Sequence, residues 1–457
     1  MSDAGQALAY ARGSRSATVA ELKELLRFPS VSGAPTSTGP MSRCALWIAR
    51  HLRSIGLNGV RVVRTAGHPF VYAEWRGAPG RPTLLVYGHY DVQPPGRSER
   101  WRSPPFEPTV REGELFARGA SDDKGQLFAH IKAIGAYLKT SGRLPVNVRC
   151  VFDGEEEIGS PALVRLLGRE PGRLRADVAV VSDTRFLARE RPAITHSLRG
   201  LLGCTLTVRG PAGERHAGHF GGVVLNPLEV LCDMIDGLHD TDGRIAIGGF
   251  YDRVRPVQRP PWLLAPRDAA VPRASRPSEI APGSGERGFT PSERATARPA
   301  LSVIAIDGGA GGNGAGATIP AVATATLDVR LVPDQEPVEV ERLLRRHIAT
   351  VAPTSASASV RTRVRVPPVV IDPAHPAIRA GARAFVRGFG NEPALVGSGG
   401  TIPVVSALHR ALGVPVVLMG FGLPDDNVHA PNEKFRLANL FRGIETSIAF
   451  LEEVGAA

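Results

Sequence analysis

The sequence lacks any apolar run near the roughly 20 residues that a membrane-spanning helix needs. Its N-terminal stretch 1–26 has no apolar core of the signal-peptide type and no obvious cleavage site, so we expect a cytoplasmic protein. Its four cysteines, Cys44, Cys150, Cys204 and Cys232, lie far apart and form no C-x-x-C pair. This spacing argues against a ribbon-type structural zinc site and predicts reduced, buried thiols.

Nucleic-acid-binding motifs are lacking as well. The formal net charge of +11 would suit a nucleic-acid partner. The basic residues are almost all arginines, however, and they are spread along the chain. We therefore expect no nucleic-acid partner and no membrane. A basic surface around an anionic substrate and a coding bias toward arginine both remain as explanations of the charge.

The chain is an ordinary globular sequence, with 457 residues, 43% hydrophobic and 22% charged. Its length predicts two or three domains. Apolar residues at helical spacing alternate with short apolar runs in the first part, which predicts an α/β sandwich with a largely parallel sheet. The predicted helices are 18–28, 44–56 and 122–142, and the predicted strands are 82–91, 145–152 and 176–183.

The middle of the chain has a different pattern, with strands of alternating polarity around two amphipathic helices, which predicts a small α+β domain. Its predicted strands are 201–210, 300–307 and 323–333, and its helices are 226–239 and 338–351. Between them, residues 253–298 are rich in Pro, Arg, Ser and Ala, and predict a long irregular or partly helical insertion. The end of the chain returns to α/β, with helices 378–389, 404–413 and 435–454 and a strand 414–422.

Histidines and carboxylates follow the predicted strands of the α/β part. In parallel α/β sheets, ligands bind beyond the carboxyl ends of the strands, so these side chains should converge on one edge. They are His89 and Asp91, Glu156 and Glu157, Asp183 and His429, together with Asp122 and Asp123 before a helix.

Two histidines with several carboxylates form a nitrogen–oxygen ligand set that suits Zn, Mn or Co. The set is large enough for two ions, and a carboxylate can bridge ions that lie about 3.5–4 Å apart. Each motif alone has a simpler explanation. His89 could be a plain surface or core histidine, "SDDKG" a helix-capping turn, and "GEEE" a solvated loop.

Six motifs taken together carry a family resemblance. "LLVYGHYDVQP", "RGASDDKGQ", "DGEEEIGS", "VVSDT", "RHAGHFGG" and "PDDNVHAPNEKF" occur in this order along nearly the whole chain. Their order and spacing resemble the co-catalytic di-metal peptidase family of carnosine and other dipeptidases, glutamate carboxypeptidases, aminoacylases and succinyl-diaminopimelate desuccinylase, with the dipeptidase branch most similar. The resemblance implies a phosphorylase/hydrolase-like catalytic domain from segments 1–197 and 368–457, and an inserted α+β lid or dimerisation domain at 198–367.

The resemblance also assigns the metal ligands. It implies that His89 binds one divalent ion and His429 the other, that Asp122 bridges them, and that Glu157 and Asp183 each complete one shell. Zinc is the expected metal, with manganese or cobalt as alternatives.

Further roles follow from the same resemblance. Asp91 is expected to orient His89, and Glu156 to act as the general base on water. The peptide bond between Asp122 and Asp123 is expected to be cis. His216 is expected to donate a hydrogen bond to the oxyanion, and in dimeric relatives this histidine comes from the other subunit, so a homodimer is expected. In the run "DGEEEIGS", Glu155 should be a bystander and Asp153 a loop or supporting residue.

Substrate contacts are assigned to Arg330, which resembles the family arginine that holds a substrate carboxylate, and to Gly400 and Thr401 in "GSGGTIPV". The chain departs from the family at Ala217, where Ser is usual, and at Gly397 and Ser398, where dipeptidases often carry Arg-Glu.

The sequence therefore predicts a di-metal hydrolase that cleaves the amide bond of a small peptide, most simply a dipeptide. Two alternatives stay open. The first is an N-acyl amino acid deacylase or an amidohydrolase acting on a dedicated metabolite, which uses the same metal chemistry in a different pocket. The second is a non-catalytic descendant, which the sequence disfavours because every expected ligand and the base are present.

Overall fold

The computed structural model describes residues 1–34, 38–257, 285–309 and 317–456. The chain forms two compact units, each discontinuous in sequence. Unit 1 consists of Met1–His196, Ile371–Val396 and Ile402–Ala457, and unit 2 of Ser197–Val370 and Gly397–Thr401.

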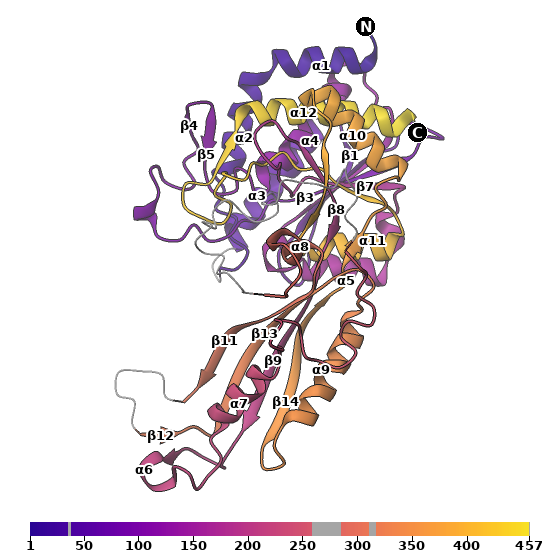
Figure 1. The fold of residues 1–457 in the computed structure, drawn as a ribbon. Coiled ribbons are helices and arrows are strands. Elements are labelled where there is room, and N and C mark those ends of the chain that lie inside the picture. Colours follow the sequence, from indigo (N-terminus) through magenta and orange to yellow (C-terminus); the bar gives the residue numbers. More distant parts are fainter. Residues whose placement is uncertain (35–37, 258–284, 310–316, 457) are drawn as a thin grey trace. The chain divides into compact units, whose positions relative to one another are not determined.

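Unit 1 is built on one large sheet (Figure 1). Its central strands β6, β3, β7 and β17 are parallel to one another, and the strands flanking them pair antiparallel. The strand order begins β1-β2-β6-β3-β7-β17-β8, and the strands are β1 (Asn58–Val63), β2 (Phe70–Trp75), β3 (Thr83–His89), β6 (Asn147–Asp153), β7 (Val178–Val181), β17 (Val416–Leu418) and β8 (Ala193–Leu198). A further strand, β16 (Ala394–Ser398), pairs with β8.

The helices of unit 1 cover this sheet, which is why its central strands are continuous apolar runs. In β3, Leu84, Leu85, Val86 and Tyr87 are all buried, as expected for a strand with helices on both faces. α4 packs against β3, while α10 and α11 pack against β17. The helices are α1 (Asp3–Gly13), α2 (Arg15–Leu26), α3 (Thr38–Ser54), α4 (Lys124–Thr140), α5 (Pro161–Arg169), α10 (Pro376–Phe389), α11 (Pro403–Leu412) and α12 (Leu437–Ala456).

A small three-stranded sheet joins two distant parts of unit 1. Its order is β18-β5-β4, where β18 is Lys434–Arg436, β5 is Glu114–Phe116 and β4 is Thr109–Arg111. β18 pairs antiparallel with β5, so the chain after His429 runs beside the chain before Asp122.

Unit 2 is a four-stranded antiparallel sheet with two helices packed on it (Figure 1). The sheet order is β11-β13-β9-β14, and one face buries an apolar core that includes Leu206, Leu231, Leu327 and Leu344. The strands of this sheet are β9 (Gly200–Arg209), β11 (Ala300–Gly308), β13 (Val322–Leu331) and β14 (Ser357–Val366), and the helices packed on it are α7 (Pro227–Asp236) and α9 (Pro337–Val351). The remaining elements of unit 2 are the short strands β10 (Arg215–His216), β12 (Thr318–Ile319) and β15 (Val369–Val370) and the short helices α6 (Ala217–Phe220) and α8 (Pro291–Thr296).

The predicted class, a mostly parallel α/β sheet with an inserted α+β part, is confirmed. The prediction of buried thiols is confirmed for Cys44, Cys150 and Cys204 but is wrong for Cys232. Cys232 is exposed because α7 packs on the core with the side that carries Leu231 and Met234, and Cys232 lies on the opposite side. Of the predicted insertion 253–298, residues 258–284 lie outside the described residues, and α8 forms near its end. Among the helices of the described segments, none combines the length and the apolar character that crossing a membrane requires.

Candidate metal centre

The candidate ligands of unit 1 sit where strands and loops end at one edge of the sheet. His89 is the last residue of β3, and Asp183 follows β7 by two residues. Glu157 lies in a short 3-10 turn, Glu156–Ile158, that follows β6. Asp122 precedes α4, and His429 lies in the loop between β17 and β18. The fold thus brings together side chains from three strand ends, one helix start and one loop.

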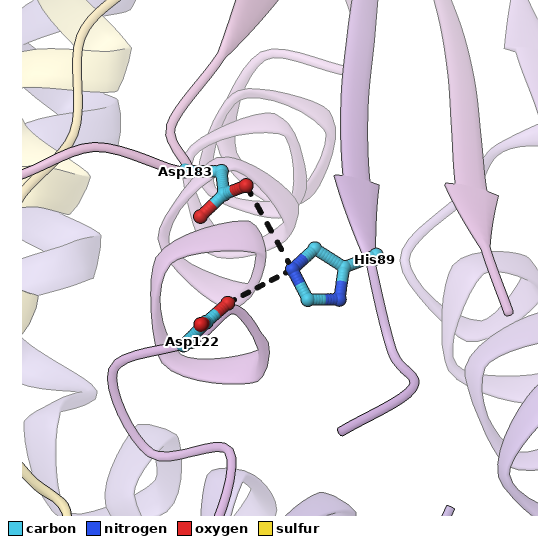
Figure 2. Close-up of side chains that lie close together, drawn as sticks. All are labelled: His89, Asp122 and Asp183. Atoms are coloured by element: carbon cyan, nitrogen blue, oxygen red, sulfur yellow. Dashed lines mark hydrogen bonds and ion pairs between the residues drawn. The ribbon is translucent and has the colours of Figure 1, made fainter. Parts of the chain in front are cut away.

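The first group consists of His89, Asp122 and Asp183. The Nε2 atom of His89 lies 3.0 Å from Oδ1 of Asp122 and 3.9 Å from Oδ2 of Asp183. Figure 2 shows the His89 ring at the end of its strand, with both carboxylates on the Nε2 side. His89 is completely buried, so its ring has a fixed environment.

The second group consists of Asp122, Glu157 and His429. The Nε2 atom of His429 lies 2.8 Å from Oδ2 of Asp122 and 3.2 Å from Oε2 of Glu157. Each group places one possible ligand atom per residue within 4.8 Å of the others. Asp122 therefore presents one carboxylate oxygen to each histidine, which is the arrangement that a bridging carboxylate between two ions requires.

Asp91 connects both groups. The Nδ1 atom of His89 lies 3.1 Å from the backbone oxygen of Asp91 and 3.4 Å from its Oδ1. These oxygens favour a proton on Nδ1 and leave Nε2 as the candidate ligand atom. The Asp91 carboxylate also accepts hydrogen bonds from the backbone N–H groups of Glu156 (3.1 Å) and Glu157 (3.0 Å). Asp91 thus contacts both the His89 ring of the first group and the turn that carries Glu157 of the second.

The carboxylates of the site carry more negative charge than the protein compensates. Burial and the neighbouring Asp183 and Asp122 carboxylates raise the pKa of Glu156 well above its usual value. Burial and Asp122 do the same to the pKa of Asp183. Burial also opposes ionisation of Asp122, but hydrogen bonds from His429 and His89 hold the pKa of Asp122 well below its ordinary range.

The histidines respond in the opposite direction. Burial lowers the pKa of His89, yet hydrogen bonds with Asp122 and Asp91 raise it overall to well above its usual value. Hydrogen bonds with Asp122 and Glu157 raise the pKa of His429 to about 10. The protein alone can meet this surplus of negative charge only by binding protons, so divalent cations fit the donor set and its electrostatics.

Two details of the expected site are also present. The peptide bond between Asp122 and Asp123 is cis. Asp123 is completely buried, and its Oδ2 accepts a hydrogen bond of 3.2 Å from the backbone N–H of His89. A residue not predicted from the sequence, Gln93, donates to Glu157 through its backbone N–H (3.2 Å) and its side-chain Nε2 (2.9 Å). Nothing in the motif "HYDVQP" distinguishes that glutamine from a surface residue.

The remaining predicted residues belong to unit 2. Arg330 pairs with Asp328 through Nε (2.7 Å) and Nη2 (3.1 Å), and its Nη1 donates to Oγ1 of Thr401 (3.1 Å). The Thr401 hydroxyl in turn donates to the backbone oxygen of Arg199 (2.6 Å). The backbone N–H of Gly400 donates to Oγ of Ser398 (3.1 Å). Arg330 and Thr401 are therefore in direct contact.

His216 lies at the start of α6 and is exposed. Its Nδ1 accepts a hydrogen bond of 3.1 Å from the backbone N–H of Gly218. The proton of the neutral ring is therefore on Nε2, which leaves that atom as a donor.

Arg199 is a second residue that sequence reasoning missed. Its guanidinium donates to the backbone oxygens of Gly399, Arg294 and Arg298, each at 3.2 Å. It therefore links the end of α8 to the glycine-rich loop that contains Thr401. A Cβ added at Gly399 would lie 2.1 Å from the backbone oxygen of Ala295, so only glycine fits there.

Comparisons with known proteins agree with this geometry. The model of peptidase family M20/M25/M40 matches residues 85–453. The Cys-Gly metallodipeptidase dug1 of Schizosaccharomyces pombe is 32% identical over 403 residues, or 85% of this chain and 83% of that protein. Human carnosine dipeptidase 1 has a similar structure, with a TM-score of 0.82, 28% identity and 100% of both chains covered. The M20 family metallo-carboxypeptidase Sso-CP2 from Sulfolobus solfataricus has a TM-score of 0.85 and 29% identity, over 96% of this chain and 99% of that one. The resemblance to the dipeptidase branch is thus confirmed, and this chain belongs to peptidase family M20/M25/M40.

Proposed function

We propose that this protein is a metal-dependent dipeptidase with two divalent ions, zinc first and manganese or cobalt as alternatives. The observation that carries the proposal is Asp122, whose two carboxylate oxygens each face a different histidine, His89 at 3.0 Å and His429 at 2.8 Å. Asp183 and Glu157 complete the two groups. This is the pattern of a site for two ions rather than of two unrelated ion pairs.

Bound divalent ions would polarise the amide carbonyl of the substrate and make water easier to deprotonate. Glu156 accepts the proton from the attacking water as the water oxygen bonds to the carbonyl carbon. It then gives this proton to the amide nitrogen, whose bond to carbon breaks, so that an acid and an amine leave. Glu156 directly precedes the candidate ligand Glu157 in the same turn, and its backbone N–H donates to Asp91 (3.1 Å), which supports its assignment as the base.

The expected substrate is a small peptide with a free carboxylate. Arg330 is the proposed carboxylate contact, with Thr401 and Gly400 forming the adjacent loop. Two of the five N–H groups of Arg330 face Asp328 and one faces Thr401, which leaves donors for a ligand. The relatives include a Cys-Gly metallodipeptidase, carnosine dipeptidase 1 and a metallo-carboxypeptidase, so dipeptides are the first substrates to test.

We also propose a homodimer, in which His216 of one subunit would donate Nε2–H to the oxyanion in the other. The edge strand β11 supports an interface, because Ile304 and Ile306 expose 62% and 52% of their surface there. The cytoplasmic location stays a prediction from the sequence.

Replacement of Glu156 tests the catalytic assignment. Glu156→Gln should keep two metal ions per chain but lose at least a thousandfold in kcat, because the amide cannot accept a proton. Metal analysis and steady-state hydrolysis of Cys-Gly and β-Ala-His measure the two quantities. Glu155→Gln, one position earlier in the same turn, is the matched control. Retained turnover in Glu156→Gln would reject its role as the base.

A substrate panel separates the two enzyme functions. Dipeptides and N-acetyl amino acids, each assayed with Zn²⁺ and with Mn²⁺, should show preferred cleavage of dipeptides. Faster cleavage of N-acyl amino acids would favour the deacylase instead. A purified protein that binds no metal and cleaves neither class would revive a binding role.

Mixed dimers test the shared site. His216→Ala and Glu156→Gln should each be inactive alone, and a mixture should regain part of the activity if His216 acts across the dimer. A monomer in gel filtration, or a mixed dimer without recovery, would contradict the proposal.

A further inference from the structure

Glu433 is a carboxylate without solvent exposure that lies four positions after the candidate ligand His429. Its Oε1 accepts hydrogen bonds from the backbone N–H groups of Ser121 and Asp122, both at 3.0 Å. Its Oε2 accepts from the backbone N–H of Gly119 (3.0 Å) and from Nη1 of Arg118 (2.7 Å). One buried carboxylate thus accepts four hydrogen bonds from residues 118–122, the segment that ends with the candidate bridging ligand Asp122.

A second carboxylate, which precedes His429 in the sequence, binds the same segment 118–122. Oδ2 of Asp426 accepts hydrogen bonds from Oγ of Ser121 and from the backbone N–H of Leu423, both at 2.7 Å. Asp426 is 1% exposed. The loop with His429 is therefore attached to the loop with Asp122 on both sides of the histidine.

The attachment matters because the backbone at His429 is in an unfavourable region. Its φ is +62°, the left-handed conformation that residues other than glycine seldom adopt. Such a conformation persists where surrounding contacts determine it. Hydrogen bonds to an ionised carboxylate are roughly twice as strong as neutral ones, and leaving such a carboxylate buried without partners is unfavourable. Separation of the two loops would leave the Glu433 carboxylate buried without its hydrogen-bond donors.

We propose that Glu433 is a positioning residue, which fixes Asp122 and His429 in ligand geometry before any ion binds. The inference rests on the proposed metal site and extends it, since Glu433 contacts neither ion nor substrate in this assignment. Without Glu433, the ions themselves would have to order both loops, and part of the binding free energy would be used for that ordering.

The test is metal affinity in Glu433→Gln. The amide keeps the size of the side chain, and its oxygen can still accept from Ser121 and Asp122. Its NH₂ group cannot accept from Gly119 and Arg118, so half of the attachment is lost. Titration of chelator-stripped protein with Mn²⁺ in a calorimeter should show an affinity at least tenfold weaker than in the wild type. Activity should fall at low Mn²⁺ and recover at saturating Mn²⁺, with KM for the dipeptide unchanged.

Glu445→Gln is the matched control. Glu445 is another buried carboxylate of unit 1, which pairs with Arg12 and Arg15 at 2.7 and 3.4 Å. Its replacement should lower thermal stability without changing Mn²⁺ affinity, which separates positioning from general destabilisation.

Three outcomes separate the hypotheses. Equal Mn²⁺ affinity in wild type and Glu433→Gln would overturn the positioning role and leave the proposed function intact. A wild type that binds no divalent ion would reject the proposed function. If Glu433→Gln does not fold, hydrogen exchange of the metal-free wild type decides: slow exchange at the amides of Ser121 and Asp122 supports the proposal, and exchange at loop rates overturns it.

Discussion

The four carboxylates of "DGEEEIGS" have different partners, although their chemistry is nearly the same. Asp153 accepts from the Tyr87 hydroxyl (3.3 Å), and Glu155 accepts from the backbone N–H groups of His68 (2.8 Å) and Ala162 (3.0 Å). Glu157 instead faces His429 at 3.2 Å. Two backbone N–H groups thus bind the Glu155 carboxylate, whereas Glu157, which also accepts from Gln93, lies beside His429 in the second group.

Sequence reasoning could place this run beside a metal site because charge and strand position are local properties. It could not find Glu433, because nothing in "APNEKF" shows that four donors from residues 118–122 approach that carboxylate. Partners more than 300 positions away are a property of the fold.

At the same scale, His130 is predicted to make the protein sensitive to acid. Burial lowers the pKa of His130 to about 4, and its Nε2 lies 2.6 Å from Oγ of Ser182. That hydroxyl donates to the backbone oxygen of Met419 (2.7 Å), so His130 donates to it as a neutral ring. Between pH 6.5 and 4, His130 binds a proton in the unfolded chain but not in the folded chain. The free energy of unfolding therefore falls as the pH drops from 6.5 toward 4.

The measurement is urea unfolding of chelator-stripped protein at pH 7.5 and 5.0. Between these pH values, the free energy of unfolding should fall by about 2 kcal/mol more in the wild type than in His130→Gln. His239→Gln, at an exposed histidine, should behave like the wild type. An equal loss in wild type and His130→Gln would show that this histidine does not titrate with folding.

At the scale of elements, prediction succeeded where burial gives a clear pattern. β3 and β6 are apolar runs in the centre of a covered sheet, and both were predicted from the sequence. β14 was missed because it is an edge strand whose sequence "SASVRTRVRV" exposes Arg361, Arg363 and Arg365. α1 was missed because it is a short alanine-rich helix whose buried residues are Ala4, Ala7 and Ala11.

The short helix α8 carries a prediction about substrate binding. Arg199 holds the end of α8 and the backbone oxygen of Gly399, and its own backbone oxygen accepts from the Thr401 hydroxyl. Arg199→Ala should therefore loosen the loop next to Arg330 and raise KM for dipeptides about tenfold, with a smaller effect on kcat.

Steady-state kinetics with dipeptides and with their C-terminal amides would measure this effect. The rise in KM should be largest for substrates with a free carboxylate. Arg209→Ala changes an exposed arginine at the end of β9, the strand that begins directly after Arg199, and should leave KM unchanged. An unchanged KM in Arg199→Ala would mean that this loop does not contact the substrate.

At the scale of the whole molecule, all five candidate metal ligands belong to unit 1. A ligand that binds the folded state at a thousand times its Kd stabilises it by about 4 kcal/mol. Stripping the metal should therefore increase hydrogen exchange in the turn of Glu157 and in the segment around Asp183 after β7, and much less in the strands β9 and β13 of unit 2.

Hydrogen exchange followed by mass spectrometry, with and without chelator, measures this directly. Re-addition of Zn²⁺ or Mn²⁺ should restore the slow exchange, which controls for damage by the chelator. Equal changes in β9 and in the turn of Glu157 would indicate metal-dependent stability that extends beyond the ligand segments.

The attachment of Ser121 to Asp426, 305 residues apart in sequence, has a consequence for biosynthesis. While the chain emerges from the ribosome, His89, Asp122, Glu157 and Asp183 are made long before His429. Before the loop after β17 has been made, the incomplete site has three carboxylates around a single histidine. It also lacks the carboxylate of Glu433, which accepts hydrogen bonds from residues 118–122. Both candidate ligand groups are therefore complete only once the loop with His429 has been made, so a chain that stops before this loop should bind fewer divalent ions.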